Sequence, residues 1–191
     1  MIGDIIRPAI MLFVIMDSLG SLPVFWHITK GLSEEKRRHL ANRTFFIAAI
    51  VLAIFLFFGL RILEFFGVTF GSFKIAGGIV VLIFGVRLVL GQGTHEERVK
   101  NYEEAMVPIA TPLLVGPGVI ATAIIFYDQY GPPVTVFAVL IAFLISWLIF
   151  HYASDLMRIF GRQGSDAVSR LMGMLIITIA VQLILDGLAM V

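Results

Sequence analysis

The sequence predicts an all-α integral membrane protein in which six transmembrane helices form two inverted three-helix repeats. Apolar residues make up 59% of the 191 positions and charged residues only 14%, whereas a soluble domain carries about 25% charged residues. The apolar residues lie in runs long enough to cross a hydrocarbon core of about 30 Å, which takes about 17–25 helical residues. Two of these runs are interrupted by glycine and proline at matching places in the two halves of the chain.

The first span, from about Pro8 to Ile28, is predicted to be a retained helix rather than a cleaved signal peptide. Its stretch Ile10–Met16 is as apolar as a signal sequence, but no small-residue cleavage site follows it. The segment Asp17–Pro23 interrupts the span and contains Gly20. We therefore expect the first transmembrane helix to be broken near mid-membrane.

The second and third spans run from about Phe45 to Leu63 and from about Lys74 to Leu90. Both are continuously apolar, whereas the strands of a membrane β-barrel alternate between apolar and polar residues. The third opens with the small residues Ala76, Gly77 and Gly78, which let helix backbones approach closely. We interpret these small residues as a packing surface rather than a ligand site.

The remaining three spans follow the same order. They run from about Ala105 to Tyr127, from about Val134 to Tyr152 and from about Arg170 to Met190. The first of them is interrupted by Pro112–Gly118, as the first span of the chain is interrupted by Asp17–Pro23. The fourth helix is therefore also predicted to be broken at mid-membrane.

An internal repeat relates the two halves. A shift of 96 residues superposes the interrupted helices and places Gly20 on Gly116 and Gly77 on Gly173. Because three spans is an odd number, the second half, 97–191, must enter the membrane from the side opposite to the first half, 1–96. The sequence therefore predicts one membrane domain, 1–191, built as an inverted repeat, a plan that many secondary transporters share.

Basic residues predict the orientation of the protein in the membrane. Eleven of the 14 Lys and Arg residues lie in or beside the connections after the first, third and fifth spans. The opposite side has only Arg7, Arg61 and Lys74. Cytoplasmic connections carry such an excess of basic residues, so we expect both termini on the outer side.

The two interruptions are the predicted binding site. Proline removes a backbone donor, and each should unwind its helix for several residues that face protein or a watery cavity. Half-helix N-termini attract anions and free carbonyls bind cations, a combination that suits a small zwitterion. The predicted site residues are Ser18, Gly20, Ser21, Pro23, Thr111, Pro112, Gly116, Pro117, Gly118 and Thr122. The alternative is a pair of simple kinks, with the hydroxyls serving as interhelical hydrogen bonds.

Asp17 is the acidic residue farthest from any predicted span end. A carboxylate at that depth costs at least about 2.5–3.5 kcal/mol on insertion scales, so it should face the protein interior. Three roles remain open: a cap for the restarted helix, an ion pair with Lys74 or Arg170, or the coupling site for H⁺ or Na⁺. We assign Asp17 as the candidate ion-coupling residue.

Several classes of function are not expected. The chain has no cysteine, which excludes disulfides, thiolate metal sites and iron–sulfur clusters. Its four histidines have no metal-ligand spacing, no catalytic constellation is visible, and no segment is basic enough for nucleic acid. We predict no enzyme activity, no cofactor and no nucleic-acid partner, and the oligomeric state is left open.

The sequence resembles the MarC family of small membrane proteins. The stretches Asp17–Phe25, Phe73–Gly78 and Val107–Gly118 carry the resemblance, which covers essentially the whole chain. The family often has Pro at the position of Ser18 and Asn at that of Ser21. The resemblance implies a six-span inner-membrane protein. One archaeal branch of the family is associated with uptake of small neutral amino acids, such as glycine and alanine, driven by a cation gradient, and the resemblance implies this activity as an expectation for the present chain.

These observations lead to one functional hypothesis and two alternatives. The hypothesis is a secondary transporter of small neutral amino acids, coupled to H⁺ or Na⁺ and embedded in the lipid bilayer of the inner membrane. The alternatives are a channel or exporter for another small solute, and a membrane scaffold that transports nothing.

The predicted orientation is tested with reporters fused to the C-terminus. Alkaline phosphatase, which works only outside the cytoplasm, should be active there, and a fluorescent reporter that folds only in the cytoplasm should be dark. The opposite pattern would place the C-terminus inside and contradict the reading of the basic residues.

Overall fold

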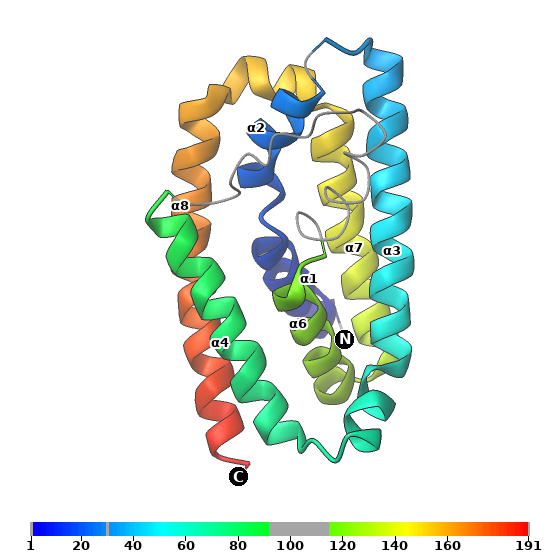
Figure 1. Ribbon diagram of the computed structural model, residues 1–191, viewed down its shortest axis with the longest axis vertical. Coiled ribbons are helices and arrows are strands. Elements are labelled where there is room, and N and C mark those ends of the chain that lie inside the picture. The colour runs from blue at the N-terminus through cyan, green and yellow to red at the C-terminus, as the bar shows by residue number, and fades with distance from the viewer. Residues whose placement is uncertain (1, 30, 92–114, 191) are drawn as a thin grey trace.

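The computed structural model describes residues 2–29, 31–91 and 115–190, and every regular element in these ranges is a helix (Figure 1). The helices are α1 (Ile2–Met16), α2 (Ser18–Ile28), α3 (Glu34–Phe65), α4 (Phe70–Val89), α6 (Pro117–Tyr130), α7 (Pro132–His151) and α8 (Ala153–Leu188). Within the described ranges, five stretches are long and apolar enough to cross a membrane: Ile5–Pro23, Glu34–Phe65, Phe70–Val89, Pro132–His151 and Gln163–Leu188. The predicted all-helical membrane class is confirmed.

The predicted spans correspond to these helices in order. The first becomes α1 and α2 together, and the second, third, fifth and sixth become α3, α4, α7 and α8. The second half of the predicted fourth span is α6, while its first half, 105–114, lies outside the described residues. The described ranges therefore leave the fourth crossing only partly tested.

Two helices are longer than hydropathy predicted because polar turns extend them. Helix α3 begins at Glu34, where the hydroxyl of Ser33 accepts a hydrogen bond from the Lys36 amide at 3.4 Å. Helix α8 begins at Ala153 and bends at Gly161, whose φ of 61° departs from helical geometry. Polar helix ends carry no hydropathy signal, so hydropathy did not locate these extensions. The charged run Glu34–Arg38 did predict a helix start, and α3 confirms it.

The first break is shorter than predicted. Only Asp17 leaves the helical conformation, with φ 42°, and α2 then continues through Gly20 and Pro23. Proline is tolerated inside membrane helices that neighbouring helices support, and α2 packs against both α7 and α8. The predicted unwinding over several residues is therefore wrong for this break, which is a single-residue interruption.

The broken helix occupies the interior of the bundle. Over half of the most apolar part of Ile5–Pro23 is buried, against a third or less in each of the other four spans. Helix α1 packs against α6 and α7, and α6 also packs against α3 and α4. Figure 1 shows α1 and α6 between the long helices, with both termini in the lower half of the molecule.

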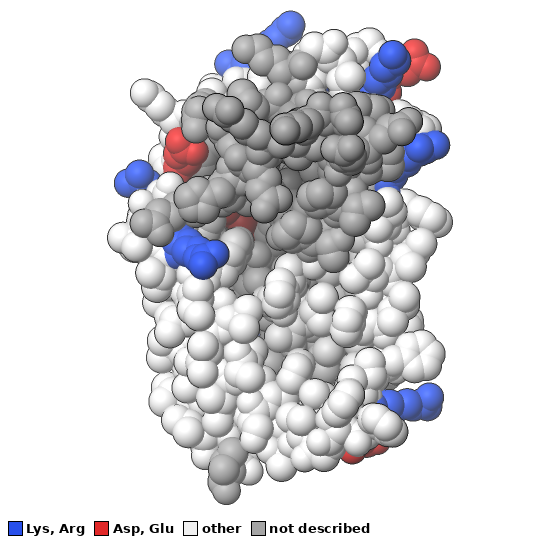
Figure 2. Space-filling view, viewed as in Figure 1, with Lys and Arg blue, Asp and Glu red and all other residues white. Residues whose placement is uncertain are grey.

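Charged side chains gather towards one end of the molecule. Figure 2 shows most of the visible Lys and Arg residues in the upper part and a wide uncharged band below them. The upper end holds the start of α3 and the turn between α7 and α8, and α4 ends lower down, in the upper half (Figure 1). The sequence predicted basic connections beside these helix ends, and the uncharged band is the surface expected to face lipid.

Helices α4 and α8 pack along an antiparallel seam of small residues. The seam repeats every seven residues on both helices and pairs Gly71 with Gly187, Gly78 with Ala180, and Gly85 with Gly173. A Cβ added at Gly78 would lie 2.9 Å from the Ala180 carbonyl oxygen, and one at Gly85 would lie 3.0 Å from the Gly173 carbonyl oxygen. Since those atoms are backbone, the helices approach as closely as glycine permits.

The seam predicts that Gly78 tolerates no side chain. Gly78→Leu should lower the midpoint of thermal unfolding in detergent, because overpacking costs about 1–3 kcal/mol or more and here meets backbone. Ala76→Leu is the matched control, since Ala76 lies two residues away on the same helix and is exposed. Equal midpoints for the two variants would contradict the seam.

Candidate functional site

The first half of the candidate site is the junction between α1 and α2. The Asp17 amide donates to the Val14 carbonyl at 3.1 Å, which closes the last turn of α1, and the Ser21 amide donates to the Asp17 carbonyl at 2.9 Å. Asp17 itself has φ 42°, in the left-handed region that aspartate tolerates better than most residues. One aspartate therefore ends one helix and starts the next.

The two carboxylate oxygens of Asp17 have different partners. Oδ1 accepts a hydrogen bond from the Gly20 amide at 3.3 Å, which is the geometry of a helix N-cap. Oδ2 accepts a hydrogen bond from the hydroxyl of Ser169, on α8, at 2.7 Å. The side chain is only 3% exposed, so these bonds replace the water that an ionised carboxylate loses on burial.

Of the three roles predicted for Asp17, the structure supports the cap and gives no support to the ion pair. No salt bridge joins Asp17 to Lys74 or Arg170, both of which lie within the described residues. The Lys74 ammonium instead lies 5.2 Å from the centroid of the Phe70 ring. The capping and ion-coupling roles remain compatible, because the cap uses one carboxylate oxygen only.

Gly20 provides the space in which Asp17 and Ser169 meet. A Cβ built on Gly20 would overlap both the Oδ2 atom of Asp17 and the hydroxyl of Ser169. Any side chain at this position would therefore displace one of the two groups. Gly20 was predicted as a ligand-binding residue; in the structure, its lack of a side chain leaves room for Asp17 and Ser169 to meet.

The second half of the site is the start of α6. Gly116 precedes the helix in an extended conformation without a side-chain cap, and Pro117 occupies the first helical position. The first helical hydrogen bond runs from the Ile120 amide to the Gly116 carbonyl at 3.1 Å. The amides of Gly118 and Val119 therefore have no partner inside the helix, and Thr111 and Pro112 lie outside the described residues.

The two halves of the site adjoin each other. A Cβ built on Gly118 would lie 3.7 Å from Cγ2 of Ile15, two residues before Asp17, and 3.1 Å from Cγ2 of Val81 on α4. Figure 1 shows the α1–α2 junction and the start of α6 midway along the long helices. Segments about 100 residues apart in the sequence are thus neighbours in the interior.

Buried hydroxyls are present on both sides of this contact. Ser18 follows Asp17 and Thr122 lies one turn after Gly118; each is 0% exposed, and its hydroxyl has no hydrogen-bond partner among the described residues. Ser21 is also buried. A buried hydroxyl without a partner costs about 1–3 kcal/mol, so these positions would gain from a polar ligand.

Comparison with known proteins assigns the family. The family model described as MarC family integral membrane protein matches residues 2–191. The chain belongs to the MarC family. The resemblance noted from the three sequence stretches is confirmed.

Relatives of this MarC protein match along almost their whole length. A UPF0056 membrane protein of Archaeoglobus fulgidus is 36% identical over 93% of this chain and 89% of its own. The UPF0056 inner membrane protein YhgN of Escherichia coli K12 is 33% identical over 98% of both chains. A UPF0056 membrane protein of Methanocaldococcus jannaschii is 34% identical over 93% of this chain and 92% of its own. No solved structure matches.

Sequence reasoning missed Ser169 and the surroundings of Arg37. The buried Arg37 guanidinium donates to the Thr29 hydroxyl at 3.1 Å, to the Glu34 carboxylate at 3.0 Å and to the Ser154 hydroxyl at 2.6 Å. The Ser154 hydroxyl also donates to Glu34. This Arg37 cluster joins the end of α2 to the starts of α3 and α8, whereas the sequence suggested only a charged helix start.

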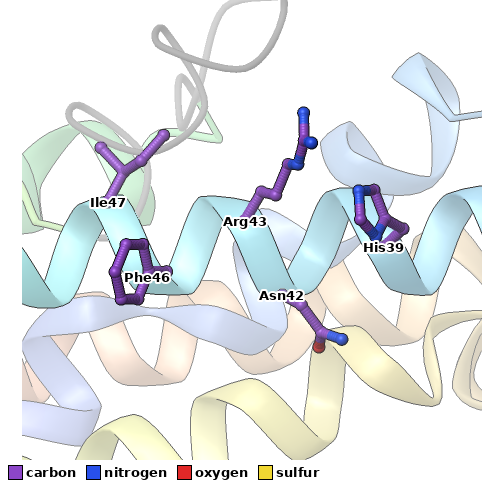
Figure 3. Close-up of a pocket in the computed structure, with 5 residues that line it drawn as sticks. All are labelled: His39, Asn42, Arg43, Phe46 and Ile47. Carbon is purple, nitrogen blue, oxygen red and sulfur yellow. The ribbon is translucent and has the colours of Figure 1, made fainter.

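A cavity of about 520 Å³ lies apart from the predicted site residues. Figure 3 shows its described lining, which comes from one face of α3 and comprises His39, Asn42, Arg43, Phe46 and Ile47. Asn42 accepts a hydrogen bond from the Trp147 indole at 2.8 Å. Among the described residues, no predicted site residue lines this cavity, so the candidate site stays at the helix breaks.

The capping geometry predicts an order of stability for variants of Asp17. Asp17→Asn should unfold close to the wild-type temperature, because asparagine caps helices and tolerates a positive φ. Asp17→Ala should lose at least about 1 kcal/mol, because it removes the cap and keeps the backbone strain. Thermal unfolding in detergent tests this order, with Asp166→Ala at an exposed position of α8 as the control. Indistinguishable Asn and Ala variants would show that the cap contributes nothing.

Proposed function

We propose that this MarC protein is a secondary transporter of small neutral amino acids, glycine- or alanine-like, driven by a gradient of H⁺ or Na⁺. The observation that carries the proposal is a buried carboxylate at a helix break that adjoins the uncapped start of a second helix. Paired half-helix ends of this kind hold the substrate and coupling ion in transporters with inverted repeats.

The packing of the helices supports an inverted repeat. The shift of 96 residues exchanges α2 with α6, α3 with α7, and α4 with α8. Helix α2 packs against α7 and α8, and α6 packs against α3 and α4, which are the exchanged partners. The antiparallel α4–α8 seam is also what a two-fold axis in the membrane plane would require of two equivalent helices.

The chemistry of the two breaks suits a small zwitterion. The amides of Gly118 and Val119, which have no partner inside α6, would receive the carboxylate of an amino acid at the positive end of the helix. The Asp17 carboxylate would attract its ammonium group or the coupling cation. The hydroxyls of Ser18 and Thr122 would complete the hydrogen bonds, and the tight packing around Gly118 favours a substrate with little or no side chain.

The location and orientation are part of the same proposal. The Escherichia coli relative is named as an inner membrane protein, and this chain has the apolar helices of a multi-pass protein. With the basic end of the molecule on the cytoplasmic side, both termini would lie outside. Solute and cation would then reach the breaks alternately from the two sides.

The experiment is uptake of labelled glycine and alanine by proteoliposomes. The purified protein should concentrate either solute when a Na⁺ or H⁺ gradient is imposed, and only then. Equilibration without concentration would instead indicate a channel, and no uptake at all would leave a scaffold role.

A paired variant ties the activity to the site. Gly118→Leu should abolish uptake while the protein still inserts, because the new side chain would collide with Val81 and Ile15. Gly3→Leu is the matched control, since nothing lies within 4 Å of a Cβ at Gly3. Normal uptake by Gly118→Leu would show that the substrate does not bind at this break.

A further inference from the structure

We infer that Ser169 is a positioning residue that sets the affinity of Asp17 for the coupling cation. The inference deepens the proposed function, because it concerns the same carboxylate and rests on that function. Ser169 lies on α8, 152 residues from Asp17, and its hydroxyl is the only group outside α2 that hydrogen-bonds to the Asp17 carboxylate among the described residues.

Capping does not explain the bond between Asp17 and Ser169. The cap uses Oδ1 and the Gly20 amide, whereas Ser169 binds Oδ2. Removing the Ser169 hydroxyl would therefore leave α2 capped and release only the second oxygen. The bond to Oδ1 therefore serves the cap, and the bond from Ser169 to Oδ2 serves a second role of the carboxylate.

Three residues build the contact, and each has a feature that is unusual in an apolar membrane helix. Asp17 has a left-handed backbone, Gly20 has no Cβ to block the contact, and Ser169 is a buried polar residue in an apolar span. A side chain on Gly20 would overlap both partners. The contact also links the first half of the chain to the second, which are the parts that move against each other in transporters of this plan.

A hydroxyl suits a carboxylate that exchanges a cation. It donates to the ionised carboxylate, accepts from the protonated one, and offers an oxygen ligand to a hard cation such as Na⁺. Among the described residues of α6, α7 and α8, no titratable side chain forms a hydrogen bond or ion pair with Asp17. Ser169 is therefore the residue of α8 that responds when Asp17 binds or releases the cation.

The chain offers a matched control one turn away. Ser165 is also a buried serine of α8, but its hydroxyl donates to the Gly161 carbonyl of its own helix at 3.1 Å. Ser165→Ala removes the same group from the same helix without touching Asp17. A purely structural serine should behave like Ser165 in every assay of cation dependence.

The first measurement is the cation dependence of glycine uptake in proteoliposomes. Ser169→Ala should shift the half-saturating cation concentration by about tenfold or more, since hydrogen bonds to charged groups are the strong ones. The shift should be upward for Na⁺, which loses an oxygen ligand, and downward for H⁺, because the ionised carboxylate loses a donor. The maximal rate at saturating cation should stay within about twofold, and Ser165→Ala should match the wild type.

The second measurement does not require transport. Na⁺ or H⁺ should raise the thermal unfolding midpoint of the purified protein, and Ser169→Ala should shift the half-effective concentration as it does for uptake. Unshifted values in Ser169→Ala would overturn the inference even if the variant is less stable. If the cation stabilises the wild type but the wild type takes up no glycine, the proposed function is overturned, and the stability assay still tests Ser169. If the wild type shows neither stabilisation nor uptake, both the proposed function and the role of Ser169 are overturned.

Discussion

The hydrocarbon core of a membrane forms no hydrogen bonds, so the protein itself must supply partners for the backbone groups at a helix break. Asp17 supplies them at the α1–α2 junction, where it ends α1, caps α2 and binds Ser169. Gly20 leaves the space that this contact needs, and α2 packs against α8 around it. The remainder of the bundle surrounds the junction with long apolar helices.

Two sets of contacts hold the half-helix α2 at its ends. Asp17 and Ser169 fix its start to α8, and Thr29 just beyond its end joins the Arg37 cluster, which also binds Ser154 of α8. Both ends of α2 are therefore attached to α8, on either side of its bend at Gly161. Helix α6 has no side-chain cap at its start among the described residues, and its first amides have no partner inside the helix.

The sequence predicted the features that local chemistry determines. Apolar runs located the long helices, and the segment Asp17–Pro23 marked the first interruption. Most of the predicted second interruption, Pro112–Gly118, lies outside the described residues. The sequence did not predict that Pro23 would sit inside α2, because tertiary packing supports that turn. Nor did it reveal Ser169, because a serine 152 positions from its partner carries no local signal. The seven-residue spacing of Gly71, Gly78 and Gly85 is visible in the sequence, but the register against α8 is not.

In the proposed transporter, the junction beside Asp17 is a site reached in turn from both sides of the membrane. The chain contains no cysteine, so Thr122→Cys introduces a single thiol at a buried position of α6. The measurement is its reaction with a membrane-impermeant thiol reagent applied to each side of oriented vesicles. For a site with alternating access we expect labelling from both sides, with protection by glycine in the presence of the coupling cation. A thiol that never reacts from either side, or reacts regardless of ligand, would contradict alternating access at this site.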